Sequence, residues 1–244
     1  MYELPFSDFF RESVLLSEGG NIFSSRRINK AEVIPTLKKA QELTGLSLLD
    51  NTLGSTGKTD TSGDLDVVVD SNKTNKDEFI KQLISKGVDP SHLKKTGIEV
   101  AYKSPIYTAN GEETEDFVQI DFMYHDDPSY LKFYYANNET PPYRGAHRNI
   151  TLSSIAKTKG HSLSMKGLAD RETKQIITKN PDEIAKKILG EDATQKDLFN
   201  LPSIISYLRK HYSEEEIKAM VQEAEKTIGI NILWFHLKNI LNTL

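Results

Sequence analysis

The sequence predicts an α+β fold, in which a mixed sheet with helices on one face is followed by a C-terminal helical region. Three observations support this prediction. Between residues 29 and 124, two helical stretches alternate with three strand-like runs. After Asn149 the apolar residues recur at helical spacing. The 244 residues, 37% hydrophobic and 27% charged, are enough for one large domain or two small ones with proper cores. We place a sheet domain at residues 1–145 and a mainly helical domain at 146–244.

The first helix is expected from Asn29, a good N-cap residue, to about Leu43. Pro35 should bend this helix and Gly45 should end it. A second helix is expected after the N-cap Asn75, with Gly87 as its end. Its predicted buried stripe consists of Phe79, Ile80, Leu83 and Ile84.

Three runs rich in apolar and β-branched residues read as strands, at Asp64–Val69, Ile98–Ile106 and Phe117–Tyr124. Asn110-Gly111 between the last two is a hairpin signal. The order helix, strand, helix, strand, strand predicts a mixed sheet backed by helices on one face. The opposite face would carry the acidic side chains.

The C-terminal part is expected to be helical, with a short hairpin around Gly167–Thr178. Asn180-Pro181 is a good helix start, because proline suits the first helical position. Ser213 and Glu216 form a capping box. The apolar stripe in residues 230–244 is more typical of a core or an interface than of a cofactor site.

Composition excludes several classes of protein. The chain has no cysteine, so disulfides, zinc–thiolate sites and cysteine catalysis are excluded. The six histidines show no metal-ligand spacing. The first residues, Met1–Pro5, lack the features of a signal peptide, and no run approaches the ~20 apolar residues of a membrane span. We expect a soluble, cytoplasmic protein without a membrane partner.

The pair Asp64 and Asp66 is the strongest functional signal. Aspartate is depleted in strands, yet these two residues stand at i and i+2 in an apolar, strand-like run. Side chains alternate along a strand, so both carboxylates must project from one face. Two such carboxylates repel unless a cation lies between them or one of them takes a proton. A divalent metal beside a phosphate-holding turn is the simplest arrangement that explains the spacing.

A third acid stands in the middle of another strand-like run. Asp121 shares one face of this run with Gln119, whereas Val118, Ile120 and Phe122 share the other. A neighbouring strand would bring Asp121 alongside the acid pair, giving oxygen ligands for two Mg²⁺ ions, which Mn²⁺ can replace. This arrangement predicts a nucleotidyl-transfer site.

The acids and the loop before them also suggest other kinds of site. Asp64 and Asp66 are also compatible with an edge strand whose charges discourage aggregation. A P-loop is rejected because it needs a glycine at position 52, which is threonine. A calcium loop is rejected because Leu65–Val69 is strand-like and the required loop glycine is missing.

Three features together resemble the DNA polymerase β-like nucleotidyltransferase superfamily, and within it the palm of family X polymerases. They are the Gly54-Ser55 turn, the run Ser62-Gly63-Asp64-Leu65-Asp66 with apolar residues after it, and an acid on a later strand. The resemblance implies a palm fold in residues 1–145. It implies that Asp64 and Asp66 bind both metals, and that Asp121 holds the catalytic metal and helps to deprotonate the attacking hydroxyl.

The same resemblance implies a nucleotide site. The triphosphate would be cradled at the Gly54 turn by Ser55, Lys58, Ser62 and Gly63. The family usually has arginine at the position of Lys58, and its loop to the acid pair is one residue longer.

Further along, the segment from Tyr143 to Asn149 with Ala156 and Gly160 is similar to the family X segment after the third acid. There, aromatic residues lie near the sugar and an asparagine reads the base edge, roles that would fall to Tyr143 and Asn149. The arginine expected to touch the template is Ser153 here. The likeness covers about residues 26–190, and the chain also resembles small nucleotidyltransferase-like proteins of tailed bacteriophages, which would place it in the host cytoplasm.

Charge is distributed unevenly. The net charge is −4, yet residues 144–179 carry eight basic and two acidic residues, +6 locally. This segment predicts contacts with triphosphate and a nucleic-acid backbone; an ordinary solvated helix face is the alternative. The residues assigned to nucleic acid are Arg148, Lys157, Lys159 and Lys166.

We therefore expect a Mg²⁺-dependent enzyme that transfers a nucleotide from an NTP or dNTP to an acceptor hydroxyl. The length leaves no room for the additional DNA-gripping domains of full family X polymerases, which favours untemplated addition to a nucleic-acid 3′ end. A protein or small-molecule acceptor, and a non-catalytic nucleic-acid-binding protein with a palm fold, are the alternatives.

Overall fold

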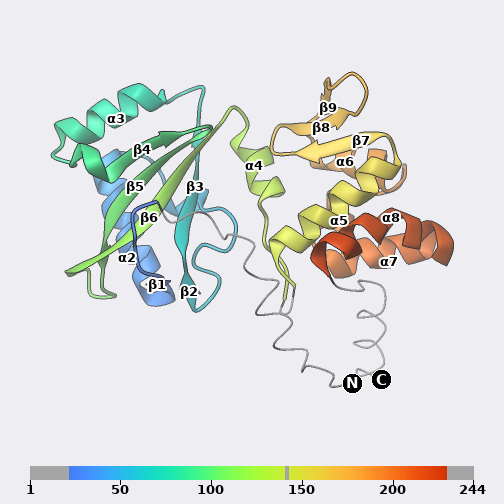
Figure 1. The fold of residues 1–244 in the computed structure, drawn as a ribbon, viewed down its shortest axis with the longest axis horizontal. Helices are drawn as coiled ribbons and strands as arrows, with labels where there is room; N and C mark the ends of the chain where they lie inside the picture. Colours follow the sequence, from blue (N-terminus) through green and yellow to red (C-terminus); the bar gives the residue numbers. More distant parts are fainter. Residues whose placement is uncertain (1–21, 141–142, 230–244) are drawn as a thin grey trace. The chain divides into compact units, whose positions relative to one another are not determined.

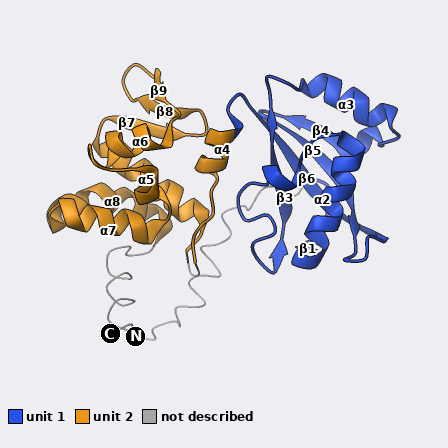
Figure 2. Ribbon diagram, turned by 180° about the vertical axis from the view of Figure 1, so that it is seen from behind, with its two compact units in different colours: residues 1–128 blue, residues 129–244 orange. Residues whose placement is uncertain are grey.

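The computed structural model describes residues 22–140 and 143–229 (Figure 1). The chain divides into two compact units, residues 1–128 and 129–244 (Figure 2). This division lies earlier than the predicted domain boundary after residue 145, because helix α4 (Pro128–Tyr134) contributes Tyr130 to the core of the second unit. The predicted stripe in 230–244 and the segment Met1–Pro5 lie outside the described residues.

The first unit is built on a four-stranded mixed sheet. Its strand order is β3-β6-β5-β4, and the strands span Asp64–Asp70, Glu113–His125, Glu99–Tyr107 and Leu93–Thr96. β3 and β6 are parallel, and the other neighbours are antiparallel. A two-residue ladder joins β1 (Ile28–Asn29) to β2 (Thr61–Ser62). The predicted α+β class with a mixed sheet is confirmed.

Helices α2 (Lys30–Thr44) and α3 (Lys76–Ser85) cover one face of this sheet (Figure 1). α2 contains Pro35 and ends at Gly45, whose φ of 76° suits glycine. Asn75 caps α3 by accepting hydrogen bonds from the N–H groups of Asp77 and Glu78. The core between helices and sheet is apolar, with Leu37 and Phe79 as buried helix residues.

The prediction for the α3 stripe is wrong at one position. Phe79 and Leu83 are buried and Ile80 is partly buried, whereas Ile84 is 40% exposed. A helix turns about 100° per residue, so Leu83 lies about 40° from Phe79 around the axis and Ile84 about 140°, beyond the strip that faces the sheet.

The predicted hairpin joins β5 to β6. Gly111 has a φ of 82°, and its N–H donates to the carbonyl of Thr108 over 2.8 Å. A short 3₁₀ turn, η2 (Pro90–His92), leads into β4, the edge strand, which sequence patterning did not indicate.

The second unit is mainly helical. Besides α4 it contains α5 (Gly145–Thr158), α6 (Pro181–Ile188), the 3₁₀ turn η3 (Gln195–Leu198), α7 (Leu201–His211) and α8 (Glu214–Ile228). A three-stranded antiparallel sheet of β7 (His161–Ser164), β8 (Gly167–Asp170) and β9 (Ile176–Thr178) contains the predicted short hairpin. Asn180 and Ser213 cap α6 and α8 as predicted. No helix in the described ranges has the length and apolar character needed to cross a bilayer.

Candidate functional site

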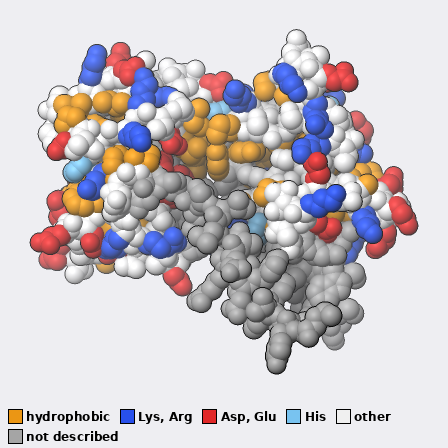
Figure 3. Space-filling model, in the orientation of Figure 1, with side chains coloured by type: hydrophobic (Ala, Val, Ile, Leu, Met, Phe, Trp, Pro, Cys, Tyr) orange, Lys and Arg blue, Asp and Glu red, His pale blue; other side chains and the backbone are white. Residues whose placement is uncertain are grey.

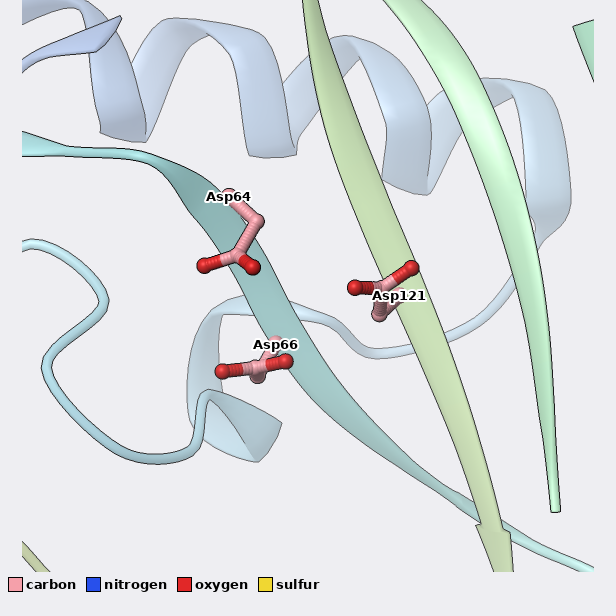
Figure 4. A group of neighbouring side chains, drawn as sticks. All are labelled: Asp64, Asp66 and Asp121. Atoms are coloured by element: carbon pink, nitrogen blue, oxygen red, sulfur yellow. The ribbon is translucent and has the colours of Figure 1, made fainter. Parts of the chain in front are cut away.

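Three aspartates meet on the face of the first unit's sheet that the helices leave uncovered. Asp64 and Asp66 lie on β3, and Asp121 lies opposite Asp66 on the neighbouring parallel strand β6. One carboxylate oxygen from each lies within 4.8 Å of the others. Figure 4 shows the three carboxylates projecting into the same space from the two strands.

The alternation of side chains along β3 and β6 determines which face of the sheet carries these acids. Leu65, Val67 and Val69 alternate with the aspartates on β3 and are buried in the core against the helices. On β6, Ile120 and Phe122 flank Asp121 and are fully buried on the same core side. Burial of these apolar residues fixes the register, so the acids must face the other way. The predicted convergence of the three acids is therefore present in the structure.

The electrostatics of the group are unfavourable without a counter-charge. Burial, with further repulsion from Asp64, Asp121 and Glu99, raises the pKa of Asp66 to about 8. Burial also raises the pKa of Asp121 to about 6, although hydrogen bonds from Gln119 oppose this shift. The carboxyl groups of Asp66 and Asp121 therefore stay protonated at pH values well above the ordinary pKa of aspartate.

Glu99 is a fourth acid that the sequence interpretation missed. It begins β5, two residues before Ala101, which pairs with Asp121, so the three residues share one face of the sheet. Its carboxylate accepts a hydrogen bond from the hydroxyl of Thr96 over 2.7 Å. The sequence indicated a strand here but not its register against β6, and the register alone brings Glu99 toward the aspartates.

The donor set fits a hard divalent cation. Converging carboxylate oxygens are the ligands that Mg²⁺ and Mn²⁺ take in proteins. A cation would replace the protons on Asp66 and Asp121 and relieve the repulsion among the three acids. Asp64, Asp66 and Asp121 are the residues that would hold it, as the sequence predicts.

The predicted phosphate loop lies along the free edge of β3. The backbone N–H of Leu53 donates to the carbonyl of Asp66, and the N–H of Asp66 donates to the hydroxyl of Thr56. Gly54 has a φ of 58°, and a Cβ added there would lie 3.5 Å from a carboxylate oxygen of Asp66. The loop is therefore tied to the acid, and Thr56 is a contributor that sequence reasoning missed.

Ser55 and Lys58 form the exposed end of this loop. The N–H of Lys58 donates to the carbonyl of Ser55 over 2.9 Å, and both residues are exposed. They are accessible to a ligand, and their predicted role in phosphate binding remains a prediction.

Ser62 and Gly63 lie on the other side of the acid pair. Ser62 is 3% exposed, and in the part of the chain that is described its hydroxyl has no hydrogen-bond partner. A Cβ on Gly63 would lie 3.3 Å from the guanidinium of Arg27, which also donates to the side chain and backbone of Thr61. Arg27 reaches this turn because β1 pairs with β2, a long-range contact that the sequence does not reveal.

Tyr143 and Asn149 belong to the second unit. The amide of Asn149 donates to the carbonyl of Tyr134 over 2.8 Å and accepts from Arg148 over 3.0 Å. The ring of Tyr143 lies edge-on to His147 at 6.4 Å. Both residues are half-buried within their own unit, and their predicted roles toward sugar and base remain predictions.

The assignment of Arg148 to nucleic acid is wrong. Arg148 is 1% exposed, and its guanidinium donates to the carbonyls of Leu198 and Phe133 and lies over the Phe133 ring at 4.9 Å. A guanidinium enclosed by backbone carbonyls holds the second unit together and is not accessible to a phosphate backbone.

The three predicted lysines differ in their surroundings. Lys157 pairs with Glu223, and Lys159 lies over the ring of Tyr212 at 5.0 Å. Lys166 is exposed at the turn between β7 and β8. On the face of the second unit seen in Figure 3, basic side chains are interspersed with acidic ones.

Two cavities of the second unit border predicted residues. Asn149, Ser153 and Lys157 line a cavity of about 270 Å³ together with Glu223 and other residues of α8. Lys159 borders a larger one of about 540 Å³, with His161 and Arg171. Neither cavity includes the aspartates of the first unit.

Comparison with known proteins yields structural likeness only. No protein-family model and no curated protein matches the chain. Two solved structures of Leishmania infantum polymerase beta are similar to it. A ternary P/T complex matches with a TM-score of 0.44 and 14% identity, covering 71% of this chain and 72% of the polymerase chain. A ternary gap complex matches with a TM-score of 0.42 and 13% identity, covering 84% and 68% respectively. The chain thus has polymerase beta structures among its neighbours, at a level of similarity that carries no statement about activity.

Proposed function

We propose that this protein is a nucleotidyltransferase that depends on divalent metal, Mg²⁺ in the first place. The proposal rests above all on one observation, the convergence of Asp64, Asp66 and Asp121 on the uncovered face of the sheet. A structural role does not explain three partly buried carboxylates that repel one another, whereas binding of two divalent ions does.

The reaction is an in-line displacement at the α-phosphate of a nucleoside triphosphate. The oxygen of an acceptor hydroxyl bonds to the α-phosphorus, the bond from that phosphorus to the bridging oxygen breaks, and pyrophosphate leaves. Bound divalent ions neutralise the phosphate charge and make the attacking hydroxyl more acidic. The rest of the catalysis is positioning by the protein.

Asp121 is the residue proposed to take the proton of the attacking hydroxyl. It lies opposite Asp66 on the neighbouring strand, and a bound cation would keep its carboxylate ionised and therefore able to accept a proton. Asp64 and Asp66 hold the metal from the neighbouring strand. Both lie on the same face of the sheet as Asp121, and Asp66 pairs directly with it, so the three carboxylates reach the same small region.

The two turns on either side of the acid pair are proposed to hold the triphosphate. Ser55 and Lys58 are accessible at one turn, and Gly63 forms the other beneath the guanidinium of Arg27. Cationic side chains and open turns of this kind suit phosphate oxygens. Arg27 thereby adds a cation to those proposed from the sequence.

For the acceptor we propose the 3′ end of a nucleic acid, extended without a template. Ser153 supports the absence of a template, because a neutral hydroxyl stands where the family has an arginine, in a cavity shared with α8. A protein or small-molecule hydroxyl is the second candidate. It is favoured by the burial of Arg148 and by the contacts of Lys157 and Lys159 inside their own unit.

The test is a transfer assay with a matched inactive variant. The protein is incubated with each α-labelled NTP and dNTP, Mg²⁺ or Mn²⁺, and pooled RNA, DNA or lysate protein. We expect label on one acceptor class with the wild type and none with the Asp64→Asn, Asp66→Asn variant. Absence of transfer to every acceptor, or equal transfer by the double variant, would refute the proposal.

A further inference from the structure

Gln119 is the residue that holds Asp121 in place. It lies two positions before Asp121 on β6, on the same face, and is 2% exposed. Its amide nitrogen lies 3.0 Å from one carboxylate oxygen of Asp121 and 2.9 Å from the other. Its amide oxygen accepts a hydrogen bond from the backbone N–H of Ile22 over 2.9 Å.

These contacts fix the orientation of the Gln119 amide. The carboxylate can only accept hydrogen bonds, so it must face the NH₂ group, and the N–H of Ile22 must face the amide oxygen. A flipped amide would set oxygen against carboxylate and nitrogen against N–H. Both ends of the buried amide therefore support one rotamer, which in turn orients Asp121.

The near-equal distances show which side of the carboxylate Gln119 occupies. A donor equidistant from both oxygens lies in the fork between them, which is also the position of an ion that binds a carboxylate through both oxygens. With the fork taken, a metal can approach Asp121 only through the outward lone pairs of one oxygen. The oxygens of Asp64 and Asp66 lie on β3, next to β6, within reach of that approach.

Gln119 is also a neutral donor. A cation in its place would compete with a metal for the charge of Asp121, whereas an amide orients the carboxylate and leaves the charge in place. The basic residue opposite Gln119 on the same face is Lys103, and its ammonium lies over the ring of Phe117 at 4.4 Å. Among the described residues, Gln119 is the only side chain that donates a hydrogen bond to Asp121.

We propose that Gln119 is a positioning residue of the metal site, which blocks the fork of Asp121 and presents one oxygen to the metal. The link to catalysis rests on the proposed nucleotidyltransferase function, whereas the link to metal binding does not.

The test compares Gln119→Met with Lys103→Met. Both replace a side chain on the same face by one of similar length, but only the first loses the contact with Asp121. We expect Gln119→Met to weaken Mn²⁺ binding about tenfold, measured by calorimetry without nucleotide, and to lower kcat by a similar factor. The nucleotide KM should stay within about threefold, and Lys103→Met should match the wild type. If Gln119→Met does not fold, Gln119→Asn takes its place, because the shorter amide cannot reach both oxygens.

A double-variant cycle decides whether Gln119 acts through Asp121. In an Asp121→Asn background, adding Gln119→Met should leave Mn²⁺ affinity unchanged. An equal loss of affinity in both backgrounds, or unchanged Mn²⁺ affinity in Gln119→Met alone, would overturn the inference. If the wild type transfers no nucleotide, the proposed function fails, and the Mn²⁺ measurements still decide the role of Gln119.

Discussion

Raising the pH should destabilise the metal-free first unit. Asp66 has a pKa of about 8 and Asp121 of about 6 in the folded protein, against 3.8 for an ordinary aspartate. Between pH 6 and pH 8 the folded state therefore carries protons that the unfolded state has already lost. Stability falls with rising pH wherever the folded state binds more protons than the unfolded state. The contribution is fully present below about pH 4 and is lost as the pH rises through 6 and 8.

The size of the effect follows from the two pKa values. Averaged over pH 6 to 8, Asp66 holds about 0.85 of a proton and Asp121 about 0.15, roughly one proton in all over two pH units. At 1.36 kcal/mol per proton and pH unit, the free energy of unfolding should fall by about 2–3 kcal/mol. For a unit of this size that corresponds to roughly 8 °C in Tm.

Hydrogen exchange in EDTA measures this change in the correct unit. The chain has two compact units, so the readout must come from amides of β3 and β6, corrected for intrinsic exchange at each pH. The matched control is Asp66→Asn, which cannot titrate and should lose less than about 1 kcal/mol over the same range. Millimolar Mg²⁺ should restore stability at pH 8, because it binds the ionised acids. Stability that is constant or rises from pH 6 to pH 8, or an equal fall in Asp66→Asn, would refute the assignment of protons to these acids.

Three further outcomes are expected. Asp121→Ala should still bind Mg²⁺–nucleotide through Asp64 and Asp66 yet lose transfer, and calorimetry showing binding lost as severely as in Asp64→Ala would contradict this division of roles. If the acceptor is a polynucleotide, Lys166→Glu should reduce the slope of log affinity against log salt by about 0.7–0.9. Lys157→Glu and Lys159→Glu should reduce this slope less, because the side chains of Lys157 and Lys159 contact their own unit. A salt-insensitive activity would favour the protein or small-molecule acceptor. Thr56→Val should cost about 1–3 kcal/mol of unfolding free energy in urea titrations, because the N–H of Asp66 loses its partner. Thr59→Val should cost less, because the bond from its hydroxyl to the carbonyl of Thr61 is exposed and water can replace it.

The parts of the fold that follow from local rules were predictable. Caps and helix ends at Asn75, Gly45 and Asn180 depend on a few neighbouring residues and are found where expected. The convergence of the three aspartates was predictable for a similar reason, since strand alternation gives the face of each acid without knowledge of the fold.

The missed features depend on contacts between distant segments. The position of Glu99 requires the register of β5 against β6, and that of Arg27 requires the pairing of β1 with β2. Arg148 was misjudged because arginine is seldom buried, and its burial depends on carbonyls at Phe133 and Leu198. These contacts join residues that are distant in the sequence, so no local sequence pattern predicts them.

The two faces of β3 separate the residues that build the fold from those that build the site. Leu65, Val67 and Val69 enter the core, and their burial is favourable whatever the ligand. Asp64 and Asp66, facing the other way, repel Asp121 until a proton or a cation intervenes. The amide of Gln119 orients the carboxylate of Asp121 without neutralising its charge. A cationic side chain in its place would stabilise the metal-free fold more. The first unit therefore keeps three carboxylates together at a cost in stability, and this cost agrees with the proposed binding of a divalent cation.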